Sequence, residues 1–385
     1  MQYRKFGNLD FKVSALGFGC MRLPTNDGNP MSGNIKEDDS IEMIRYAIDK
    51  GVNYIDTAYP YLSGNSEVLV GKALQDGYRE KVRLATKSPV WLIKEAADFD
   101  KYLNEQLEKL QTDHIDFYLL HALGKQTWHN VVLKFNLLEK VESAIKDGRI
   151  KNIGFSFHDN YDSFKEIVDG YDKWDFCQIQ YNYMDTENQA GVKGLKYAAS
   201  KGLAVVVMEP LLGGKLANPP KAIQEIFDGS NKKRSPSDWA LQWLWNQPEV
   251  SVVLSGMSTM GQVEGNINSA NISGINTLAK EDLQFVENVR IKYKERTAVP
   301  CTGCNYCMPC PNNVDIPKNF KIYNDGFMHD DVKTARGVYL RFLDEANRAS
   351  SCISCKVCEE KCPQKISISE CMPKVHEVLG EGKPY

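Results

Sequence analysis

The stretch HIDFYLLH, residues 114–121, is a nearly continuous apolar run that ends in a histidine. Strands buried on both faces of a parallel sheet have this pattern. Across residues 1–290 seven other stretches repeat it: SALGFG (14–19), VNYID (52–56), VRLATK (82–87), IKNIGFS (150–156), FCQIQYN (176–182), LAVVVME (203–209) and VSVVLSG (250–256). Segments between them, such as SIEMIRYAIDK (40–50), DFDKYLNEQLEKL (98–110) and VVLKFNLLEKVESAIKDG (131–148), have apolar residues at helical spacing. Eight strand-then-helix units predict an α/β fold, a closed (β/α)8 TIM barrel.

An open, doubly wound sheet is the alternative to a barrel. It is disfavoured because no G-x-G-x-x-G motif follows the first strand, where GFGCMR (17–22) has a different spacing. The opening YRKFGNLDFKV (3–13) is typical of a small hairpin, which we expect to cover the bottom of the barrel.

Polar residues follow the ends of the predicted strands. Asp56, Lys87, His121 and Ser156 come after four strands in order, and the later ends carry Gln180, Asn182, Glu209 and SGMS (255–258). Each residue alone has a structural explanation, as a cap, an edge residue or a core imidazole. The strand ends of a barrel meet at one rim, where active sites are built. Together these residues therefore predict an active site.

Two tyrosines, Tyr59 and Tyr61, lie in the loop after Asp56. A phenol becomes a useful general acid when a nearby ammonium group lowers its pKa, and Lys87 is placed to do so. Asp56 would keep Lys87 charged, and His121 would donate a hydrogen bond to a substrate oxygen. The group fits proton delivery to a carbonyl oxygen while hydride reaches the carbon.

The motifs VSALGFGCMRLP, GVNYIDTAYPY, LATK, DHIDFYLLH, IKNIGFSFH, QIQYN, VMEPLLGG and SGMSTMGQVEGNI resemble the aldo-keto reductases over residues 1–290. The D-T-A-x-x-Y motif of that family falls on Asp56 and Tyr61. The resemblance implies that Tyr61 is the acid, that Tyr59 is a wall residue, and that Lys87 and His121 complete the catalytic group. It also implies a small-molecule aldehyde or ketone substrate and a nicotinamide cofactor laid across the barrel mouth.

The same resemblance assigns the cofactor contacts. They are Gly19, Met21, Ser156, Gln180, Glu209, Pro210, Leu211, Gly213, Ser255, Gly256, Met257, Ser258, Gln262 and Asn266. Many members place Lys or Arg against the 2′-phosphate of NADP, where this chain has Gly256, Met257, Ser258 and Gln262. NAD and NADP both stay open, and the basic loop NKKR (231–234) is another source of charge. FMN also stays open, because a barrel groove can hold it although no flavin fingerprint is present.

Nine of the eleven cysteines lie after residue 300, in two arrays. The first is C-x2-C-x2-C-x2-C-P, with Cys301, Cys304, Cys307 and Cys310. The second is C-x2-C-x2-C-x3-C-P, with Cys352, Cys355, Cys358 and Cys362. Three cysteines at this spacing wrap a 4Fe–4S cluster, and the fourth ligates the other cluster in two-cluster ferredoxins. Zinc is disfavoured because a tetrahedral site has no place for a third cysteine at this spacing. A disulfide framework is disfavoured further in a large chain without export signals.

This rule predicts two clusters with exchanged ligands. One takes Cys301, Cys304, Cys307 and Cys362, and the other takes Cys352, Cys355, Cys358 and Cys310. The connecting segment reads as two helices broken near Gly326, which resembles the helical ferredoxin modules of multi-subunit reductases. We expect a barrel over residues 1–298 and a mainly helical ferredoxin-type domain over residues 299–385. Cys371 is expected to be a buried thiol.

A formal net charge of −3 gives no basic field for nucleic acid. No apolar run of membrane length and no apolar signal-peptide core occur, which predicts a cytoplasmic protein. The leading hypothesis is a carbonyl-reducing oxidoreductase with two 4Fe–4S clusters, either structural or serving a one-electron redox partner. The alternative is an electron-transfer or regulatory protein whose barrel binds nucleotide or flavin without carbonyl turnover.

Overall fold

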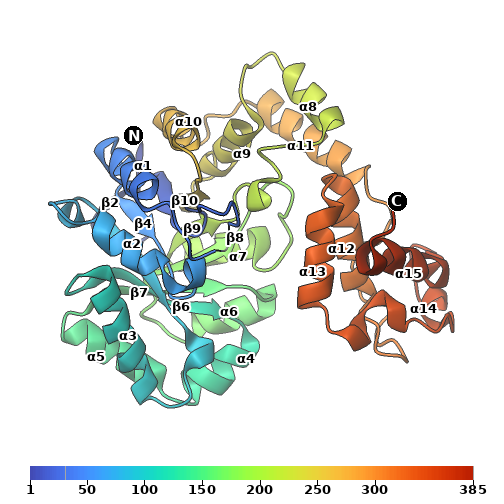
Figure 1. Cartoon of the computed structure of the whole chain (residues 1–385), viewed down its shortest axis with the longest axis horizontal. Helices are drawn as coiled ribbons and strands as arrows, with labels where there is room; N and C mark the ends of the chain where they lie inside the picture. The colour runs from blue at the N-terminus through green and yellow to red at the C-terminus, as the bar shows by residue number, and fades with distance from the viewer. Residues whose placement is uncertain (31, 385) are drawn as a thin grey trace. The chain divides into compact units, whose positions relative to one another are not determined.

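The structure, a computed structural model, describes residues 1–30 and 32–384. The chain forms two compact units. The first contains residues up to 217 together with 234–283, and the second contains residues 218–233 and those from 284 onward. In Figure 1 most of the first unit runs from blue to green, and the second includes the orange and red helices.

The first unit is the predicted barrel, closed by eight parallel strands in the order β10-β3-β4-β5-β6-β7-β8-β9. Every stretch that was predicted as a barrel strand contributes one of them. The strands are β3 (Leu16–Gly19), β4 (Tyr54–Asp56), β5 (Arg83–Ser88), β6 (Ile115–Leu123), β7 (Ile150–Phe157), β8 (Phe176–Gln180), β9 (Ala204–Met208) and β10 (Val250–Gly256).

Helices surround this barrel (Figure 1). They are α1 (Glu37–Asp49), α2 (Ser66–Ala73), α3 (Ala97–Leu110), α4 (Lys125–Thr127), α5 (Leu137–Lys146), α6 (Tyr161–Asp169), α7 (Gly191–Ser200), α9 (Pro236–Trp245) and α10 (Met260–Asn271). Three of them begin at side-chain caps that satisfy an otherwise unpaired backbone N–H. Asn160, Ser235 and Thr259 accept from the backbone of Ser163, Asp238 and Gln262 at 3.1, 3.1 and 3.3 Å.

The helix predicted over residues 131–148 is interrupted. A π-helix, η4 (Trp128–Leu133), comes first, and α5 begins only at Leu137. Asn136 between them has φ 50°, in the left-handed region. Asparagine tolerates this conformation better than most residues, so the chain turns here instead of continuing one helix.

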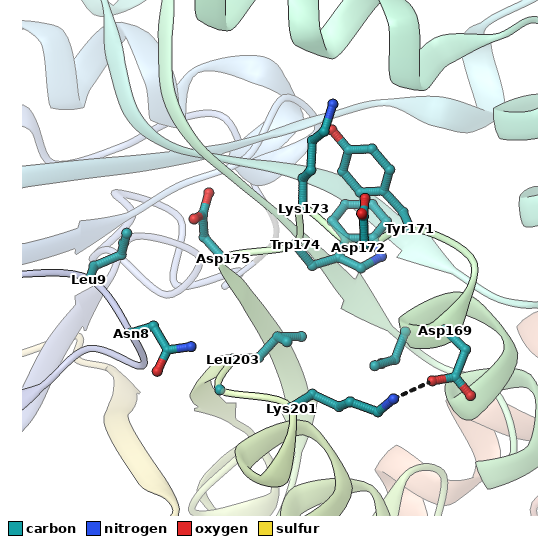
Figure 2. Close-up of a pocket in the computed structure, with 12 residues that line it drawn as sticks. Asn8, Leu9, Asp169, Tyr171, Asp172, Lys173, Trp174, Asp175, Lys201 and Leu203 are labelled. Atoms are coloured by element: carbon teal, nitrogen blue, oxygen red, sulfur yellow. Dashed lines mark ion pairs between the residues drawn. The ribbon is translucent and has the colours of Figure 1, made fainter.

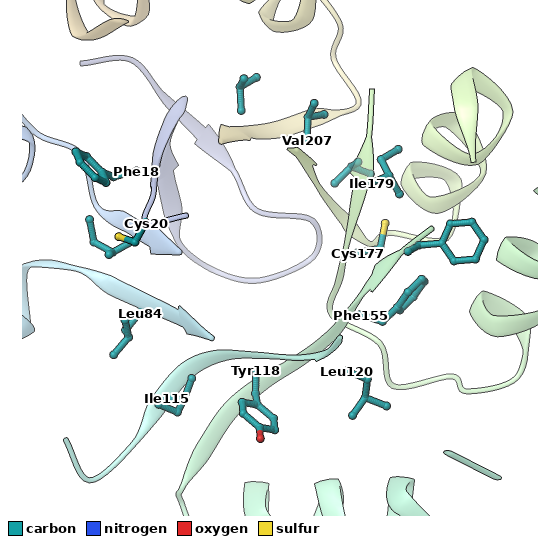
Figure 3. Close-up of a cluster of buried hydrophobic side chains, with 14 of the residues drawn as sticks. Phe18, Cys20, Leu84, Ile115, Tyr118, Leu120, Phe155, Cys177, Ile179 and Val207 are labelled. Carbon is teal, nitrogen blue, oxygen red and sulfur yellow. The ribbon is translucent and has the colours of Figure 1, made fainter. Parts of the chain in front are cut away.

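Apolar side chains on the outer faces of the strands pack beneath the helices and form the main core. Figure 3 shows part of it, with Phe18, Leu84, Tyr118, Phe155 and Val207 among the labelled side chains. These side chains come from five different strands. The near-continuous apolar runs therefore arise because both faces of each strand are covered.

The opening segment forms the predicted hairpin, with β1 (Tyr3–Lys5) antiparallel to β2 (Lys12–Ser14). Phe6 follows β1, and its ring centroid lies 4.7 Å from that of Phe117 and 5.7 Å from that of Phe176. Phe117 and Phe176 stand near the start of their strands and are fully buried. The hairpin therefore closes the N-terminal end of the barrel, and the C-terminal rim is left for the polar residues.

The second unit contains helices only, among the described residues. The α-helices are α8 (Lys221–Asp228), α11 (Lys280–Lys294, which begins in the first unit), α12 (Ile316–Met328), α13 (Val332–Phe342), α14 (Val357–Glu360) and α15 (Ile368–His376), and the short 3₁₀ and π helices are η6 (Glu345–Asn347), η7 (Ala349–Ser351) and η8 (Glu377–Glu381). Its core is small and gathers Phe320, Tyr339 and Met372 with the buried Cys307 and Cys358. The cysteines are therefore part of the packing of this unit.

The predicted break near Gly326 is wrong by a few residues, because α12 continues to Met328. A Cβ atom added at Gly326 would lie 3.0 Å from the Cβ of Ala335 on α13. The glycine therefore permits close packing of the two helices and does not end the first one. No helix in residues 1–30 or 32–384 is long and apolar enough to cross a membrane.

Candidate functional site

The inner face of the barrel changes from apolar to polar along each strand. Alternate residues of a strand point to the same face. The inward rows run from Tyr54 to Asp56, from Ala85 to Lys87, from Phe117 through Leu119 to His121, and from Phe176 to Gln178. Each row ends in a polar residue at the C-terminal end, so the strand period alone brings the predicted group together.

Lys87 is the centre of this group and is 1% exposed. Its Nζ donates to Oδ1 of Asp56 at 2.6 Å, to the carbonyl oxygen of Thr57 at 2.8 Å and to the hydroxyl of Tyr61 at 3.2 Å. The same nitrogen lies 4.7 Å from the ring centroid of Tyr61. The ammonium group thus uses its three donors on a carboxylate, a carbonyl and the phenol.

Burial dominates the electrostatics of this group. It lowers the pKa of Lys87, but the Asp56 carboxylate and the Tyr61 hydroxyl together outweigh it, and the pKa of Lys87 is raised overall. Burial raises the pKa of Asp56, while Lys87 and Gln178 act in the opposite direction. The lysine is therefore held protonated beside a carboxylate that depends on it for compensation.

The phenol of Tyr61 differs from the expectation that Lys87 would leave it with a lowered pKa. Burial raises the pKa of Tyr61 more than the Lys87 ammonium lowers it. The hydroxyl therefore stays protonated at neutral pH, which is the state that a proton donor requires. Lys87 does act in the predicted direction, but desolvation is the larger effect.

His121 lies within β6 and not after it, because the strand continues to Leu123 through an irregularity between Leu120 and Leu123. Ala122 has φ 54° there, and its N–H donates to the hydroxyl of Ser156 at 2.7 Å. Burial, followed by the charge of Lys87, lowers the pKa of His121 well below its usual value. The imidazole is neutral, and its buried Nδ1 has no hydrogen-bond partner among the described residues.

Two residues beside the group of Asp56, Lys87 and His121 were missed in the sequence. Gln178 is 2% exposed and donates to Oδ2 of Asp56 at 3.3 Å, while its Oε1 has no partner in the described part of the chain. Its position two residues after Phe176 on the inward face was a usable signal. The ring of Trp91, in the turn η3 (Val90–Leu92), lies 5.1 Å from that of His121 and is 46% exposed. No pattern in the sequence pointed to Trp91.

Tyr59 is separate from the predicted catalytic group. Its hydroxyl donates to Glu105 of α3 at 3.1 Å, and the ammonium of Lys109 lies 4.2 Å from its ring centroid. Burial and the Glu105 carboxylate raise the pKa of Tyr59 to about 12. The two neighbouring tyrosines therefore have different partners.

The predicted cofactor residues lie at or just after the C-terminal ends of β3, β7, β8, β9 and β10, and on α10. Gly213 donates its N–H to Oε2 of Glu209 at 2.6 Å, and Leu211 packs against the main core. Gln180 donates to Asp185 at 2.9 Å and accepts from Gln189 at 3.1 Å. Two other predicted positions are the buried Pro210 and the half-buried Met21.

The loop after β10 is organised by its own side chains. Asn266 donates to the hydroxyl of Ser255 at 2.9 Å, and the backbone N–H of Ser258 donates to Gln262 at 2.7 Å. Met257 between them is fully buried. Two of the predicted contacts on α10 are therefore tied to two on the loop.

Gly19 and Gly256 join the two parts of the site. Gly19 pairs in register with Asp56 on one side and with Gly256 on the other. A Cβ added at Gly256 would meet the side chain of Arg22 at 2.8 Å, and one at Gly213 would lie 4.0 Å from Nη2 of Arg22. Arg22, which sequence reasoning missed, therefore passes over Gly256 toward the Glu209–Gly213 loop. Its carbonyl accepts from the hydroxyl of Ser258 at 2.7 Å.

In the second unit the eight array cysteines line two cavities, four in each. The first cavity contains Cys301, Cys304, Cys307 and Cys362, and the second contains Cys310, Cys352, Cys355 and Cys358. Each cavity thus takes three cysteines from one array and the last cysteine of the other. Burial, with smaller contributions from Cys352 and Cys310 among others, raises the pKa of Cys358 to about 11.

The donor set fits a cluster better than a single ion. All eight donors are thiols, the ligands of iron–sulfur clusters. In residues 1–30 and 32–384 no three His, Cys, Asp or Glu side chains are gathered closely enough to hold one metal ion. Tetrahedral zinc with bonds of about 2.3 Å needs its sulfurs about 3.8 Å apart. Thiols spread around a cavity match a larger inorganic cage.

A further cavity, of about 450 Å³, opens at the N-terminal end of the barrel and is shown in Figure 2. It lies against the segments that precede β8 and β9. Its charged groups include Asp169 and Lys201, which form an ion pair at 3.0 Å. It is at the opposite end of the strands from Lys87 and takes no part in the site.

Comparison with known proteins gives the following matches. The model described as "Aldo/keto reductase family" matches residues 15–287, and that described as "4Fe-4S dicluster domain" matches residues 300–367. The chain is 29% identical to L-galactose dehydrogenase of Arabidopsis thaliana over 77% of this chain and 97% of the relative. It is 27% identical to aldo-keto reductase YhdN of Bacillus subtilis over 74% and 95%. The holo form of aldo-keto reductase AKR11C1 from Bacillus halodurans superposes with a TM-score of 0.62 at 25% identity, covering 75% of this chain and 96% of that one.

Proposed function

We propose that this protein, which belongs to the aldo/keto reductase family and is an iron–sulfur oxidoreductase, reduces an aldehyde or ketone with a nicotinamide cofactor. The observation that carries the proposal is the single ammonium group of Lys87 in contact with both Asp56 and Tyr61. Bound cofactor supplies the hydride. The side chains of the chain supply the proton and the orientation of the substrate.

Tyr61 is the proposed proton donor. Its hydroxyl is protonated at neutral pH, and Lys87 at 3.2 Å stabilises the phenolate that forms when the proton leaves. Asp56 at 2.6 Å keeps the lysine protonated throughout. A carbonyl oxygen that gains negative charge is therefore offered a proton next to a fixed positive charge.

His121 is the proposed hydrogen-bond donor to the same oxygen. Its lowered pKa keeps the ring neutral, so only one nitrogen carries a proton. The buried Nδ1 has no hydrogen-bond partner among the described residues, and in proteins a buried N–H is left unpaired more rarely than a buried acceptor. The proton is therefore assigned to Nε2, and Trp91 packs against the ring and fixes its plane.

The groups proposed to hold the cofactor are the tied pairs of the β10 loop and Arg22. Ser255 with Asn266 and Ser258 with Gln262 present hydroxyl and amide groups, and Arg22 brings a guanidinium between two of the loops. A guanidinium suits a phosphate oxygen pair. Dissociation constants of the protein for NAD and for NADP, measured side by side, show which of the two it prefers.

The second unit, which contains both cysteine arrays and is called the cysteine unit below, is proposed to hold two 4Fe–4S clusters. Cys301, Cys304, Cys307 and Cys362 ligate one, and Cys310, Cys352, Cys355 and Cys358 ligate the other. Anaerobically purified protein then contains about eight iron and about eight sulfide per chain. Zinc without sulfide overturns this part of the proposal.

The test of the proposed activity is oxidation of NADH and NADPH by the intact, anaerobic protein with a panel of aldehydes and ketones. L-Galactose with NAD⁺ or NADP⁺ is included for the reverse direction, because one relative is an L-galactose dehydrogenase. Parallel spectra record cluster bleaching and any released FMN. A cluster takes one electron while hydride carries two, and a flavin is the usual converter between them. Turnover of at least one carbonyl supports the proposal. Cofactor binding without turnover favours a non-catalytic electron-transfer protein.

A further inference from the structure

The first turn of α2 contacts the ends of the two strands that carry Asp56 and Lys87. Ser66 donates its hydroxyl to the carbonyl of Cys20 at 2.9 Å, so the hydroxyl of Thr57 donates to Ser66 at 2.8 Å. The N–H of Cys20 in turn donates to the carbonyl of Asp56 at 2.8 Å. Thr57 is the residue whose carbonyl accepts from Lys87. Ser66 therefore links the side chain of Thr57, the residue after Asp56, to the backbone of Cys20 on the neighbouring strand end.

Glu67, the next residue, reaches the other strand. Its Oε1 accepts from the hydroxyl of Thr86 at 2.6 Å and from the side-chain amide of Gln106 at 2.5 Å. The same amide nitrogen of Gln106 donates to the carbonyl of Lys87 at 3.1 Å. The hydroxyl of Tyr118 donates to Oε1 of Gln106 at 2.7 Å. Glu67 thus fixes the backbone at Thr86 and, through Gln106, at Lys87.

This network is buried at a cost in stability. Ser66, Glu67, Thr86 and Gln106 are all 0% exposed, and Oε2 of Glu67 has no partner among the described residues. Burial raises the pKa of Glu67 more than the hydrogen bonds from Thr86 and Gln106 and the charge of Lys109 lower it. Apolar side chains of equal volume often replace buried charged groups without loss of stability. Glu67, a buried carboxyl group with one oxygen unpaired among the described residues, is therefore better explained by a role in positioning its neighbours than by stability.

We propose that Ser66 and Glu67 are positioning residues, which hold the Lys87 ammonium within reach of both Asp56 and Tyr61. Neither residue contacts the proposed reacting atoms. They act through Thr57, Thr86 and the Lys87 backbone. The inference rests on the proposed carbonyl reduction, and one of its tests is independent of activity.

The test uses a matched series of variants in the full-length holoprotein. Glu67→Met keeps the volume and removes the acceptor, while Glu67→Gln keeps an acceptor oxygen and removes the charge. Gln242→Met is the control, because Gln242 is 2% exposed and donates to the carbonyl of Ser269 at 2.8 Å, away from the catalytic group. Ser66→Ala is a milder second variant that interrupts the link to Thr57.

The expected result separates activity from stability. A displacement of about 1 Å at a catalytic group costs about 100-fold in rate. We therefore expect Glu67→Met to lower kcat by about 10- to 100-fold with KM values within about threefold of wild type. Glu67→Gln restores kcat to within about threefold, and Ser66→Ala lowers it by about three- to tenfold. Gln242→Met lowers the melting temperature and leaves kcat unchanged.

The activity-independent readout is the titration of Tyr61, followed by NMR of protein with ¹³C at the tyrosine ζ carbon. Because Lys87 lowers the pKa of Tyr61, loosening Lys87 raises it further, by about half a unit or more, in Glu67→Met but not in Gln242→Met. An unchanged Tyr61 titration in both Glu67→Met and Ser66→Ala overturns the proposal. So does a kcat that falls equally in Glu67→Met and the control. If Glu67→Met does not fold, Ser66→Ala decides by the same two readouts.

Discussion

The barrel and the cysteine unit solve the problem of holding reactive side chains in different ways. In the barrel Asp56, Lys87 and His121 stand on neighbouring strands of a sheet whose apolar rows fill the space beneath them. In the second unit the array cysteines surround two cavities and lie outside the helices except for Cys358, which is on α14, and Cys307 and Cys358 are themselves part of a small core.

This difference has a thermodynamic consequence. A closed barrel buries its own core and positions its side chains before any ligand arrives. The segment that carries the cysteine arrays, residues 300–385, has fewer than about 100 residues and buries little apolar surface, so metal ligation supplies part of its folding free energy. The barrel is expected to be rigid without its cofactor, and the cysteine unit is expected to depend on its iron.

The largest expected effect is that of Cys362→Ser. Because Cys362 shares a cavity with Cys301, Cys304 and Cys307, we expect iron to fall from about eight to about four per chain. Residues after 300 then become sensitive to limited proteolysis, while a barrel fragment stays folded by circular dichroism and binds nicotinamide.

The matched control is Cys371→Ser, which removes the one cysteine after residue 300 that lies outside both arrays. It should keep the iron and the protease resistance. Loss of the barrel together with the second unit would remove the contrast between the two and would show that the iron supports the whole protein.

The next effect lies within the barrel. Tyr61→Phe removes the proposed acid and should lower kcat by about 10²–10⁴-fold while cofactor affinity stays nearly unchanged. Tyr59→Phe should keep kcat within about tenfold, because its hydroxyl donates to Glu105 and not to Lys87. Steady-state kinetics and cofactor titration measure both. Equal losses in the two variants would remove Tyr61 from its special role.

Lys87→Met tests the cost of separating a buried ion pair. It leaves Asp56 buried without its ammonium partner, which should destabilise the barrel by about 3–5 kcal/mol in urea unfolding. Lys72→Met is the control: Lys72 pairs with Glu37 at 2.8 Å, both nearly half exposed, and should cost no more than about 1 kcal/mol. A small effect at Lys87 would mean that Asp56 takes up a proton at little cost.

The smallest effect concerns pH. The pKa of His121 is well below its usual 6.5 in the folded barrel, so below that pH the unfolded chain binds a proton that the folded one excludes. The neutral His121 therefore leaves the free energy of unfolding at its full value above about pH 6.5. As the pH falls below that value, the free energy of unfolding decreases by up to about 1.4 kcal/mol per pH unit. Urea unfolding of wild type and His121→Gln between pH 5 and 8 should show curves that converge or cross toward low pH. Parallel curves would contradict a neutral His121.

The sequence was informative where a regular spacing of one kind of residue, apolar or cysteine, determines the structure. The apolar run that ends at His121 and its seven counterparts all became barrel strands, because both faces of each are covered. The cysteine spacing likewise indicated an iron–sulfur region, which matches the 4Fe–4S family over residues 300–367.

Features that depend on approach between distant segments were missed. Trp91 and Arg22 reach the site from turns that have no periodic pattern. Asn136 breaks a helix whose apolar spacing continues through it, and Gly326 marks close packing where a break was expected. The net rise in the pKa of Tyr61 depends on burial, which the neighbouring sequence does not reveal.

The central claim, that the barrel reduces a carbonyl by hydride transfer, is tested most directly by following deuterium. Cofactor labelled at C4 of the nicotinamide ring is incubated anaerobically with the intact protein and a carbonyl compound that it turns over, and the alcohol product is analysed by mass spectrometry and NMR. The account predicts one deuterium on the former carbonyl carbon, with transfer abolished in Tyr61→Phe and retained in Cys362→Ser. Product formed without deuterium, or formed only when a one-electron donor reduces the clusters, would contradict it.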